Sequence, residues 1–358
     1  MRIFEQQELF VSGQGGYARY RIPALSVTVK GTVLAFCEAR QFTGRDSDQI
    51  DLFLRRSFDG GRTFKAVQVV ATERDWVCGN PAPIVDADTG TIWLLFDKNH
   101  RHGDETMICQ GRAPRTVWVT HSDNDGATWS EPREITSAVK PSNWTWYATG
   151  PGHGVQLSSG RLIVPCDHIV LANGSRQDPH HSHVVYSDDH GQTWQVGGIA
   201  PAGTNECTAF EGKGGRLCLN CRNQRHLLEP GNHRAVTWSV DGGVTFSPVV
   251  HDAALREPVC QASTCRLDEV GSRRSRVLFS NPASRTRDHL TVRLSYDEGQ
   301  TWPLAHLLHG GPAAYSDLCV TGEGWILCLY ERGHEGPYET ISLARFNLEW
   351  LSHGADQL

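Results

Sequence analysis

Short runs of β-branched, aromatic and aliphatic residues recur along the whole chain, and turn-forming residues separate them. Typical runs lie at residues 50–54, 91–96, 116–120, 161–165 and 290–294. Short runs rich in Val, Ile, Leu, Trp and Phe are typical of β-strands. The 3.6-residue spacing of a long amphipathic helix is absent almost everywhere in the sequence. The pattern therefore predicts an all-β protein.

An eight-residue pattern, Ser-x-Asp-x-Gly-x-Thr followed by Phe or Trp, comes directly after several of these runs. Its five copies start at positions 57, 122, 187, 239 and 295, and the second copy has Asn124 in place of Asp. We call each copy a box. Asp can accept hydrogen bonds from nearby backbone N–H groups, Gly tolerates a positive φ, and the aromatic residue can plug the turn from below. Each box is therefore predicted to be the turn of a β-hairpin.

The boxes start about 60 residues apart on average, so the 358 residues hold about six such units. A unit of this length accommodates about four short strands, which is the size of a propeller blade. Closure into a ring also removes exposed sheet edges. We therefore expect a single six-bladed β-propeller of four-stranded antiparallel blades spanning residues 1–358, with both chain ends in the blade that lacks a box. A β-sandwich with a second domain explains neither the even spacing nor the lack of a linker.

The charge balance and the cysteine content restrict the partners and the compartment. The chain has 34 Lys and Arg against 40 Asp and Glu, which gives a net charge of -6. Nucleic acids and anionic membranes bind proteins through a basic face, so neither is expected to be the main partner. No apolar run approaches the roughly 20 residues of a membrane-spanning helix, and the first residues do not resemble a signal peptide. The 11 cysteines are odd in number and widely spread, which is typical of reduced thiols. We therefore expect a cytoplasmic protein without a transmembrane domain.

Two short patterns resemble metal sites but are interpreted as structural. Cys218 and Cys221 form a Cys-x-x-Cys pair, but no second pair follows at zinc-ribbon spacing. The Asp-Pro-His-His-Ser-His segment at 178–183 is read as a solvated loop that leads into a strand at 184–186. Neither a metal nor an organic cofactor is expected.

Five further motifs, together with the boxes, give the chain a resemblance to a known family. They are Tyr-Arg-Ile-Pro at 20–23, Gly-Pro-Gly-His at 150–153, Leu-Asn-Cys-Arg at 219–222, Ala-Tyr-Ser-Asp-Leu at 314–318 and Cys-Leu-Tyr-Glu at 328–331. With them the chain resembles the exo-sialidases (neuraminidases), in particular the compact bacterial and vertebrate cytosolic forms that lack appended lectin domains, so the resemblance implies no such domain here. The resemblance implies hydrolysis of terminal α-linked sialic acid from glycoproteins, glycolipids or oligosaccharides.

The resemblance also implies three arginines that bind the carboxylate of the sugar. By motif position they are Arg21, Arg222 and Arg287, and Arg285 is the alternative for the third. A guanidinium is always charged and planar, so it can meet a carboxylate with paired hydrogen bonds. Glu331 is implied to orient Arg21.

The nucleophile that the resemblance implies is Tyr315, with Glu206 as its base. A carboxylate nucleophile would be repelled by the substrate's own carboxylate, whereas a neutral phenol is not. Because the pKa of a phenol lies near 10, it needs a base. Glu211 is a weaker candidate for that base. The expected result is a tyrosyl-enzyme intermediate and retention of configuration.

Departure of the leaving group needs a proton donor. The loop at 40–48 follows a predicted strand, and Asp46 within it resembles the acid/base of the family. Asp48 is the alternative in a register shifted by two residues. Arg40 is expected to line the carboxylate side of the pocket.

Two other functions are compatible with parts of this pattern. A sialoglycan-binding propeller without catalysis would keep the boxes but lose the acid, base or nucleophile, and the chain has candidates for all three. A trans-sialidase would pass the sugar to an acceptor that binds on aromatic residues. The sequence alone does not assign Trp144, Trp146 or Tyr147 to such an acceptor site.

Overall fold

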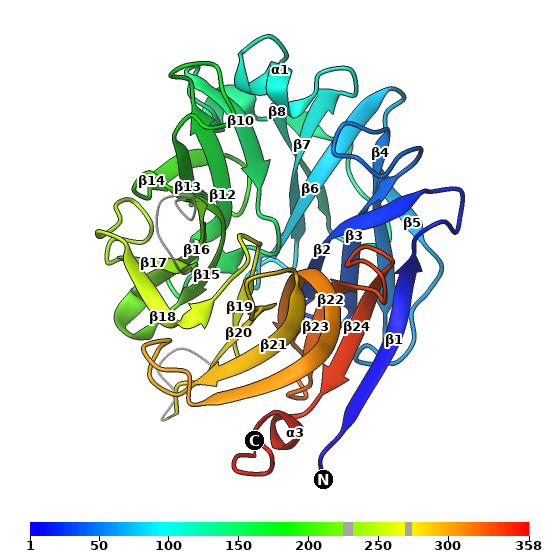
Figure 1. Cartoon of the computed structure of the whole chain (residues 1–358), viewed down its shortest axis with the longest axis vertical. Helices are drawn as coiled ribbons and strands as arrows, with labels where there is room; N and C mark the ends of the chain where they lie inside the picture. The colour runs from blue at the N-terminus through cyan, green and yellow to red at the C-terminus, as the bar shows by residue number, and fades with distance from the viewer. Residues whose placement is uncertain (225–231, 269–273, 358) are drawn as a thin grey trace.

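The computed structural model describes residues 1–224, 232–268 and 274–357, and nearly all of its regular structure is β-strand (Figure 1). The helical segments in these ranges are short: α1 (Glu105–Cys109), α2 (Thr136–Val139), a 3-10 turn (Lys213–Gly215) and α3 (Leu348–Leu351). Within the described ranges, no helix has the length and apolar character needed to cross a membrane. The prediction of an all-β protein is confirmed.

The N-terminal half begins with an eight-stranded sheet made of two antiparallel meanders. The first contains β2 (Arg19–Val27), β3 (Val33–Arg40), β4 (Ile50–Ser57) and β5 (Gln68–Ala71). The second contains β6 (Trp76–Val85), β7 (Ile92–His100), β8 (Thr116–Ser122) and β9 (Arg133–Glu134). A single parallel pairing of Ile50 with Val77 joins the two meanders.

Two separate antiparallel sheets follow in the middle of the chain. One contains β10 (Trp144–Thr149), β11 (Val155–Gln156), β12 (Leu162–Val170), β13 (His180–Ser187) and β14 (Gln195–Ile199). The other contains β15 (Thr204–Glu211), β16 (Leu217–Asn223), β17 (His233–Ser239) and β18 (Val250–Arg256).

The last sheet joins the two ends of the chain. Its strands are β19 (Ser263–Arg266), β20 (Val277–Pro282), β21 (Asp288–Ser295), β22 (Leu304–Val320), β23 (Ile326–Arg332), β24 (Thr340–Phe346) and β1 (Phe4–Val11). The long strand β22 pairs with β21 through residues 304–312 and with β23 through residues 313–320. The blue strand β1 lies beside the red strand β24 in Figure 1, and Phe4 pairs with Phe346. The prediction that the two ends share a sheet is confirmed.

Each box forms the turn after the third long strand of its meander. In the first box, Asp59 Oδ1 accepts a hydrogen bond from Thr63 N (2.9 Å) and Oδ2 accepts one from Thr63 Oγ1 (2.6 Å). In the second box, Asn124 Oδ1 accepts from Thr128 N (2.9 Å), and Asn124 Nδ2 donates to Thr128 Oγ1 (2.7 Å). An amide therefore closes the same turn as a carboxylate. The box aromatics belong to or pack against buried clusters: Phe64, Trp129, Trp194, Phe246 and Trp302.

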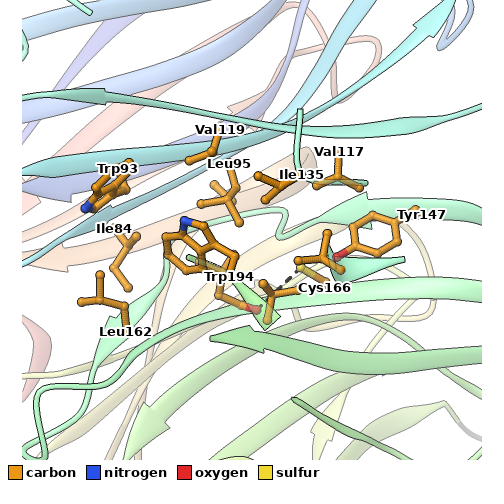
Figure 2. Packing of buried hydrophobic residues seen from close by; sticks show 14 of the residues in the cluster. Ile84, Trp93, Leu95, Val117, Val119, Ile135, Tyr147, Leu162, Cys166 and Trp194 are labelled. Atoms are coloured by element: carbon orange, nitrogen blue, oxygen red, sulfur yellow. Dashed lines mark hydrogen bonds between the residues drawn. The ribbon is translucent and has the colours of Figure 1, made fainter. Parts of the chain in front are cut away.

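The hydrophobic core lies between neighbouring sheets. Figure 2 shows one such interface, in which side chains of the β6–β9 meander face those of the β10–β14 sheet. The rings of Trp93 and Trp194 meet there edge to face, with their centroids 6.3 Å apart. Full burial of one large apolar side chain stabilises the fold by roughly 1.5–3 kcal/mol. These interfaces hold each sheet against the next.

All 11 cysteines are free thiols, and Cys265 alone among them is partly exposed. Cys218 and Cys221 lie three residues apart on β16, so their side chains point to opposite faces of the strand. They belong to two different hydrophobic clusters. This placement supports their interpretation as core thiols.

The prediction of a solvated loop at 178–183 is wrong for its histidines. Strand β13 already begins at His180, and His183 is fully buried. His183 Nδ1 lies 3.0 Å from Nδ1 of His168 on the neighbouring strand. Asp178 is also buried and accepts hydrogen bonds from four backbone N–H groups of the preceding turn. Pairing with β12 extends the strand into this polar segment, which a search for apolar runs does not detect.

Candidate active site

A cavity of about 330 Å³ opens where the first strands of several meanders approach one another. Its walls come from α1, from loops that include those of Asp46, Arg287 and Tyr338, and from nine strands: β2, β3, β6, β10, β12, β13, β15, β16 and β22. It is lined by seven of the residues expected to act on a substrate: Arg21, Arg40, Asp46, Glu206, Arg222, Arg287 and Tyr315. Glu331 is fully buried behind the cavity wall. The fold therefore brings together residues that are spread over almost 300 positions of the sequence.

Irregular strand pairing accompanies the side chains that face this cavity. Register shifts occur on the first strands between residues 21 and 24, 79 and 82, 144 and 147, 204 and 207, and 313 and 316. Arg21, Glu206 and Tyr315 lie at or inside three of these shifts. A bulge bends a strand and re-aims its side chains. Ile22 has a φ of 57°, which is unusual for a β-branched residue and marks a strained backbone beside Arg21.

Glu331 connects Arg21 to the Tyr315 segment. Its Oε1 atom accepts hydrogen bonds from Arg21 Nε (2.7 Å) and from the backbone N of Ile22 (2.9 Å). Its Oε2 atom accepts one from the backbone N of Tyr315 (3.1 Å). One buried carboxylate thus fixes both the guanidinium and the backbone that carries the phenol.

Tyr315, Glu206 and Arg222 form a hydrogen-bonded triad. The Tyr315 hydroxyl donates to Glu206 Oε1 (2.5 Å), and Arg222 Nη1 lies 2.8 Å from Glu206 Oε2 and 3.3 Å from the Tyr315 oxygen. Burial and then the negative charge of Glu206 raise the pKa of Tyr315 well above its usual value, although Arg222 and Arg287 oppose this. The phenol is therefore a neutral donor, and Glu206 is positioned to take its proton.

Arg287 reaches the cavity from the loop before β21. Its Nη1 donates to the Tyr338 hydroxyl (2.6 Å), its Nη2 donates to the carbonyl oxygen of Val259 (3.3 Å), and its guanidinium carbon lies 5.4 Å from the ring centroid of Tyr315. Among the described residues, no acidic side chain forms an ion pair with Arg287. Its positive charge is therefore available to an anion in the cavity.

Arg40 and Asp46 form an ion pair in the lining of the same cavity. Arg40 is buried and donates from Nε (2.9 Å) and Nη2 (2.6 Å) to Glu38 Oε2. Its Nη1 contacts Asp46 Oδ1 (2.6 Å). The Asp46 side chain is 68% exposed, so it can reach a ligand from the rim. Partial burial raises the pKa of Asp46, but the charges of Arg40 and Arg21 outweigh this and hold it below its usual range.

The three alternative residues occupy other places. Arg285 is exposed and does not line the cavity. Asp48 is buried, and its Oδ2 accepts a hydrogen bond from the backbone N of Gly44 (2.9 Å), which stabilises the loop. Glu211 accepts hydrogen bonds from Ser158 N (2.8 Å) and Oγ (2.6 Å), away from the cavity. The geometry thus favours Arg287, Asp46 and Glu206.

The remaining wall was not found by sequence reasoning. Glu38 and Tyr338 contact the arginines, and Glu105, Arg115, Ala148, Asp167, Arg176, His180 and Asn205 are among the residues that line the rest of the cavity. Alternation along β3 places Glu38 on the same face as Arg40, and this signal could have identified it. Tyr338 lies in the loop between β23 and β24, where no periodicity points to it.

The three aromatic residues near 145 have different positions. Trp146 lines the cavity, and the guanidinium carbon of Arg115 lies 4.2 Å from its ring centroid. Trp144 and Tyr147 are both buried in the hydrophobic cluster between the β6–β9 meander and the β10–β14 sheet, and Figure 2 shows Tyr147. Only Trp146 of these three is therefore placed to contact a ligand in this cavity.

One group in the described part of the chain has the spacing of metal ligands: Asp86, Asp88 and His190. None of these residues lines the cavity. Both carboxylate oxygens of Asp86 already accept hydrogen bonds, for example from Thr89 Oγ1 (2.8 Å) and Gln156 Nε2 (3.2 Å). We therefore assign this group to turn structure.

Comparison with known proteins agrees with this geometry. The sequence matches the family described as BNR repeat-like domain over residues 31–328. It is 37% identical to a sialidase of Micromonospora viridifaciens over 98% of this chain and 54% of that protein. It is 32% identical to Sialidase-3 of Bos taurus over 93% of this chain and 91% of that protein. The chain thus spans about half of the first relative and nearly all of the second.

A solved structure gives a similar result. The Hadza microbial sialidase Hz136 superposes with a TM-score of 0.85 at 29% identity, over 97% of this chain and 69% of that one.

Proposed function

The chain belongs to the sialidase family, and on that premise we propose that it is a retaining exo-sialidase. It acts as a glycoside hydrolase that removes terminal α-linked sialic acid from glycoproteins, glycolipids or oligosaccharides through a tyrosyl-enzyme intermediate. The observation that carries the proposal is the triad of Tyr315, Glu206 and Arg222 in a cavity that also contains Arg21 and Arg287.

The arginines are proposed to bind the carboxylate on the anomeric carbon. Arg21, Arg222 and Arg287 all line one small cavity, and the pKa of Arg222 and that of Arg287 are raised, so both remain charged. Hydrogen bonds between a guanidinium and a carboxylate are charge-assisted and can be bidentate. The site therefore selects a sugar with an acid group and fixes the face that it presents to Tyr315.

Asp46 is proposed to be the general acid of the first step and the general base of the second. Its contact with Arg40 keeps it ionised in the free enzyme. A substrate carboxylate bound among the arginines offsets their positive charge and reduces their effect on Asp46. Asp46 can then hold a proton and deliver it to the glycosidic oxygen as the bond to the leaving group breaks.

Tyr315 is proposed to form the covalent bond. Its oxygen attacks the anomeric carbon while its proton passes to Glu206 Oε1, which lies 2.5 Å away. In the second step Asp46 takes a proton from water, the water oxygen attacks the anomeric carbon, and the Tyr315 oxygen leaves and recovers its proton from Glu206. Two successive displacements retain the configuration of the sugar. At the end of the cycle Asp46, Glu206 and Tyr315 have returned to their starting protonation states, and the consumed water has replaced the proton given to the leaving group.

We also infer that the meanders are the six blades of one propeller that forms a single catalytic domain. Neighbouring first strands contact one another in the order β2 with β6, β6 with β10, β15 with β19, β19 with β22, and β22 with β2. The sheet that contains β10 contacts β15 through β12. This circular order supports a central axis with the cavity at one end.

A reducing compartment such as the cytoplasm is proposed for the protein. The support is that all 11 cysteines are free thiols. The proposed partners are sialylated glycans, because the charged lining of the cavity suits an anionic sugar.

Turnover of a fluorogenic sialoside, with and without a sialic acid transition-state analogue, tests the proposed activity. We expect hydrolysis that the analogue inhibits. Binding of sialic acid with no turnover would instead favour a glycan-binding propeller.

A further inference from the structure

The arginines of the cavity differ in how they are held. Arg21 pairs with Glu331 (2.7 Å), Arg222 with Glu206 (2.8 Å) and Arg40 with Glu38 (2.6 Å). Arg287 has no such pair among the described residues, and its two hydrogen bonds go to the Tyr338 hydroxyl and to a backbone carbonyl. Arg287 is thus fixed by neutral oxygen atoms, and no carboxylate of the described residues forms an ion pair with it.

Tyr338 contacts two of these arginines at once. Its hydroxyl oxygen accepts the 2.6 Å hydrogen bond from Arg287 Nη1, and its ring centroid lies 4.0 Å from the guanidinium carbon of Arg21. The second contact has the geometry of a cation–π interaction. The ring covers one face of Arg21 and leaves the edge of that guanidinium for a ligand.

The loop that carries Tyr338 is itself held in place. Glu339 accepts hydrogen bonds from the backbone N of His334 (3.0 Å), of Glu335 (2.7 Å) and of Gly336 (2.9 Å). Ser12 Oγ donates to the carbonyl oxygen of Tyr338 (2.8 Å). The position of the phenol is therefore set by the fold before a ligand arrives.

We propose that Tyr338 is a positioning residue that aims Arg287 and Arg21 at the substrate carboxylate without neutralising Arg287. The inference rests on the proposed function. A carboxylate in place of the phenol would orient Arg287 equally well but would compete with the substrate for its charge. A neutral acceptor orients the guanidinium and keeps the attraction to an anion in the cavity.

Tyr338 is distinguished from the proposed nucleophile by its partner. The Tyr315 hydroxyl donates to the carboxylate of Glu206, whereas the Tyr338 hydroxyl accepts from a guanidinium. A phenol needs a base to become a nucleophile. Tyr338 therefore acts through the arginines and not on the anomeric carbon.

The test compares Tyr338→Phe, Tyr338→Leu and a matched control, Tyr296→Phe. Phe removes the hydrogen bond to Arg287 and keeps the ring beside Arg21, whereas Leu removes both. Tyr296 donates to Asp356 Oδ2 (3.0 Å) and does not line the cavity, so its change to Phe controls for loss of a phenolic hydroxyl elsewhere. The melting temperature of each variant is measured first to show that it is folded.

The first readout separates KM from kcat for a fluorogenic sialoside. Loss of one hydrogen bond to a charged group should raise KM by about 10-fold in Tyr338→Phe. We expect kcat to change by less than about 3-fold, because uniform binding is lost and the reacting groups remain. Tyr338→Leu should raise KM further, and Tyr296→Phe should leave both constants unchanged.

The second readout asks whether the effect depends on the carboxylate. The probes are 2,3-didehydro sialic acid and its methyl ester, titrated by calorimetry into the wild type and Tyr338→Phe. The acid should lose about 10-fold in affinity and the ester much less, because only the acid presents a charged carboxylate to Arg21 and Arg287. Equal losses for both probes, or no loss for either, would overturn the role assigned to Tyr338. A wild-type chain that binds neither probe and turns over no sialoside would overturn the proposed function, and this inference with it.

Discussion

The Tyr315 hydroxyl and Glu206 Oε1 are 2.5 Å apart, although the two residues are separated by 109 positions in the sequence. They lie on β22 and β15, each at an interruption of regular strand pairing. Arg222 on β16 lies within hydrogen-bonding distance of both. A carboxylate, a phenol and a cation thus form one hydrogen-bonded unit, and the role proposed for each group can be tested separately.

Replacement of Arg222 with Ala should weaken carboxylate-bearing inhibitors. The side chain is the cationic partner of Glu206 and one of the three arginines in the cavity. Its loss should cost about 2–5 kcal/mol in inhibitor binding, the range for truncating one member of a buried charge pair. Calorimetric titration measures this change. Arg285→Ala is the matched control and should bind normally, because Arg285 lies outside the cavity.

Replacement of Asp46 with Asn should affect substrates according to their leaving groups. A natural sialoside has a basic leaving group that needs a proton, so its kcat/KM should fall by about 100- to 10,000-fold. An aryl sialoside with an acidic phenol as leaving group should lose far less in kcat/KM. Equal losses for both substrates would remove Asp46 from the role of acid. Asp48→Asn should instead lower the melting temperature, because Asp48 holds the backbone of its loop.

The boxes offer a test of turn chemistry through Asp241. Asp241 accepts hydrogen bonds from Ser239 Oγ (2.7 Å), Val244 N (3.0 Å), Thr245 N (2.9 Å) and Thr245 Oγ1 (2.6 Å). Asn124 closes the equivalent turn in another box, so Asp241→Asn should cost less than about 1 kcal/mol of unfolding free energy. Asp241→Ala should cost about 1–3 kcal/mol, because it removes all four acceptor contacts. Urea unfolding measures both, and equal costs would contradict this account of the box.

The pH dependence of stability should reveal the pairing of His153 with Asp317. His153 Nδ1 lies 2.8 Å from Asp317 Oδ1, and both side chains are largely buried. Burial lowers the pKa of His153, but the charge of Asp317 and the hydrogen bond outweigh this and raise it above its ordinary value of 6.5. A group whose pKa is raised in the folded state contributes its full stabilisation at pH values below its unfolded pKa. This contribution is lost as the pH rises through the folded pKa.

Comparison of the unfolding free energies of the wild type and His153→Gln across pH 5–9 tests the direction of this pH dependence. The difference should be largest below about pH 6.5 and should decrease as the pH rises above it. A difference that grows with pH would contradict the pairing.

The sequence predicted the repeating part of the fold because each box fixes its turn through contacts within a few residues. Asp59 and Thr63 are four residues apart, so their hydrogen bonds are local and leave a readable pattern. The pairing of the two chain ends was predicted because the chain holds about six units but only five boxes, and the unit without a box was assigned to the two ends. The extent of β13 was missed, because His180–Ser187 gains its strand structure from β12 and begins with polar residues.

The candidate site residues were predicted only where a motif marked them. The resemblance pointed to Arg21, Tyr315 and Glu206, but it carried no information on how their side chains are aimed. The register shifts that accompany them depend on pairing between strands and leave no local signal. Tyr338 was missed for the same reason, because its contact with Arg287 joins two loops 51 residues apart.

Covalent trapping tests the central claim most directly. A 3-fluoro sialosyl fluoride slows both chemical steps through the fluorine beside the anomeric carbon, while the fluoride leaving group restores the first step, so an intermediate accumulates. We predict time-dependent inactivation and an added mass on the peptide that bears Tyr315. Tyr315→Phe should abolish this label and still bind 2,3-didehydro sialic acid. A label on Glu206 or Tyr338, or inactivation without any label at Tyr315, would contradict the assignment of Tyr315 as the nucleophile.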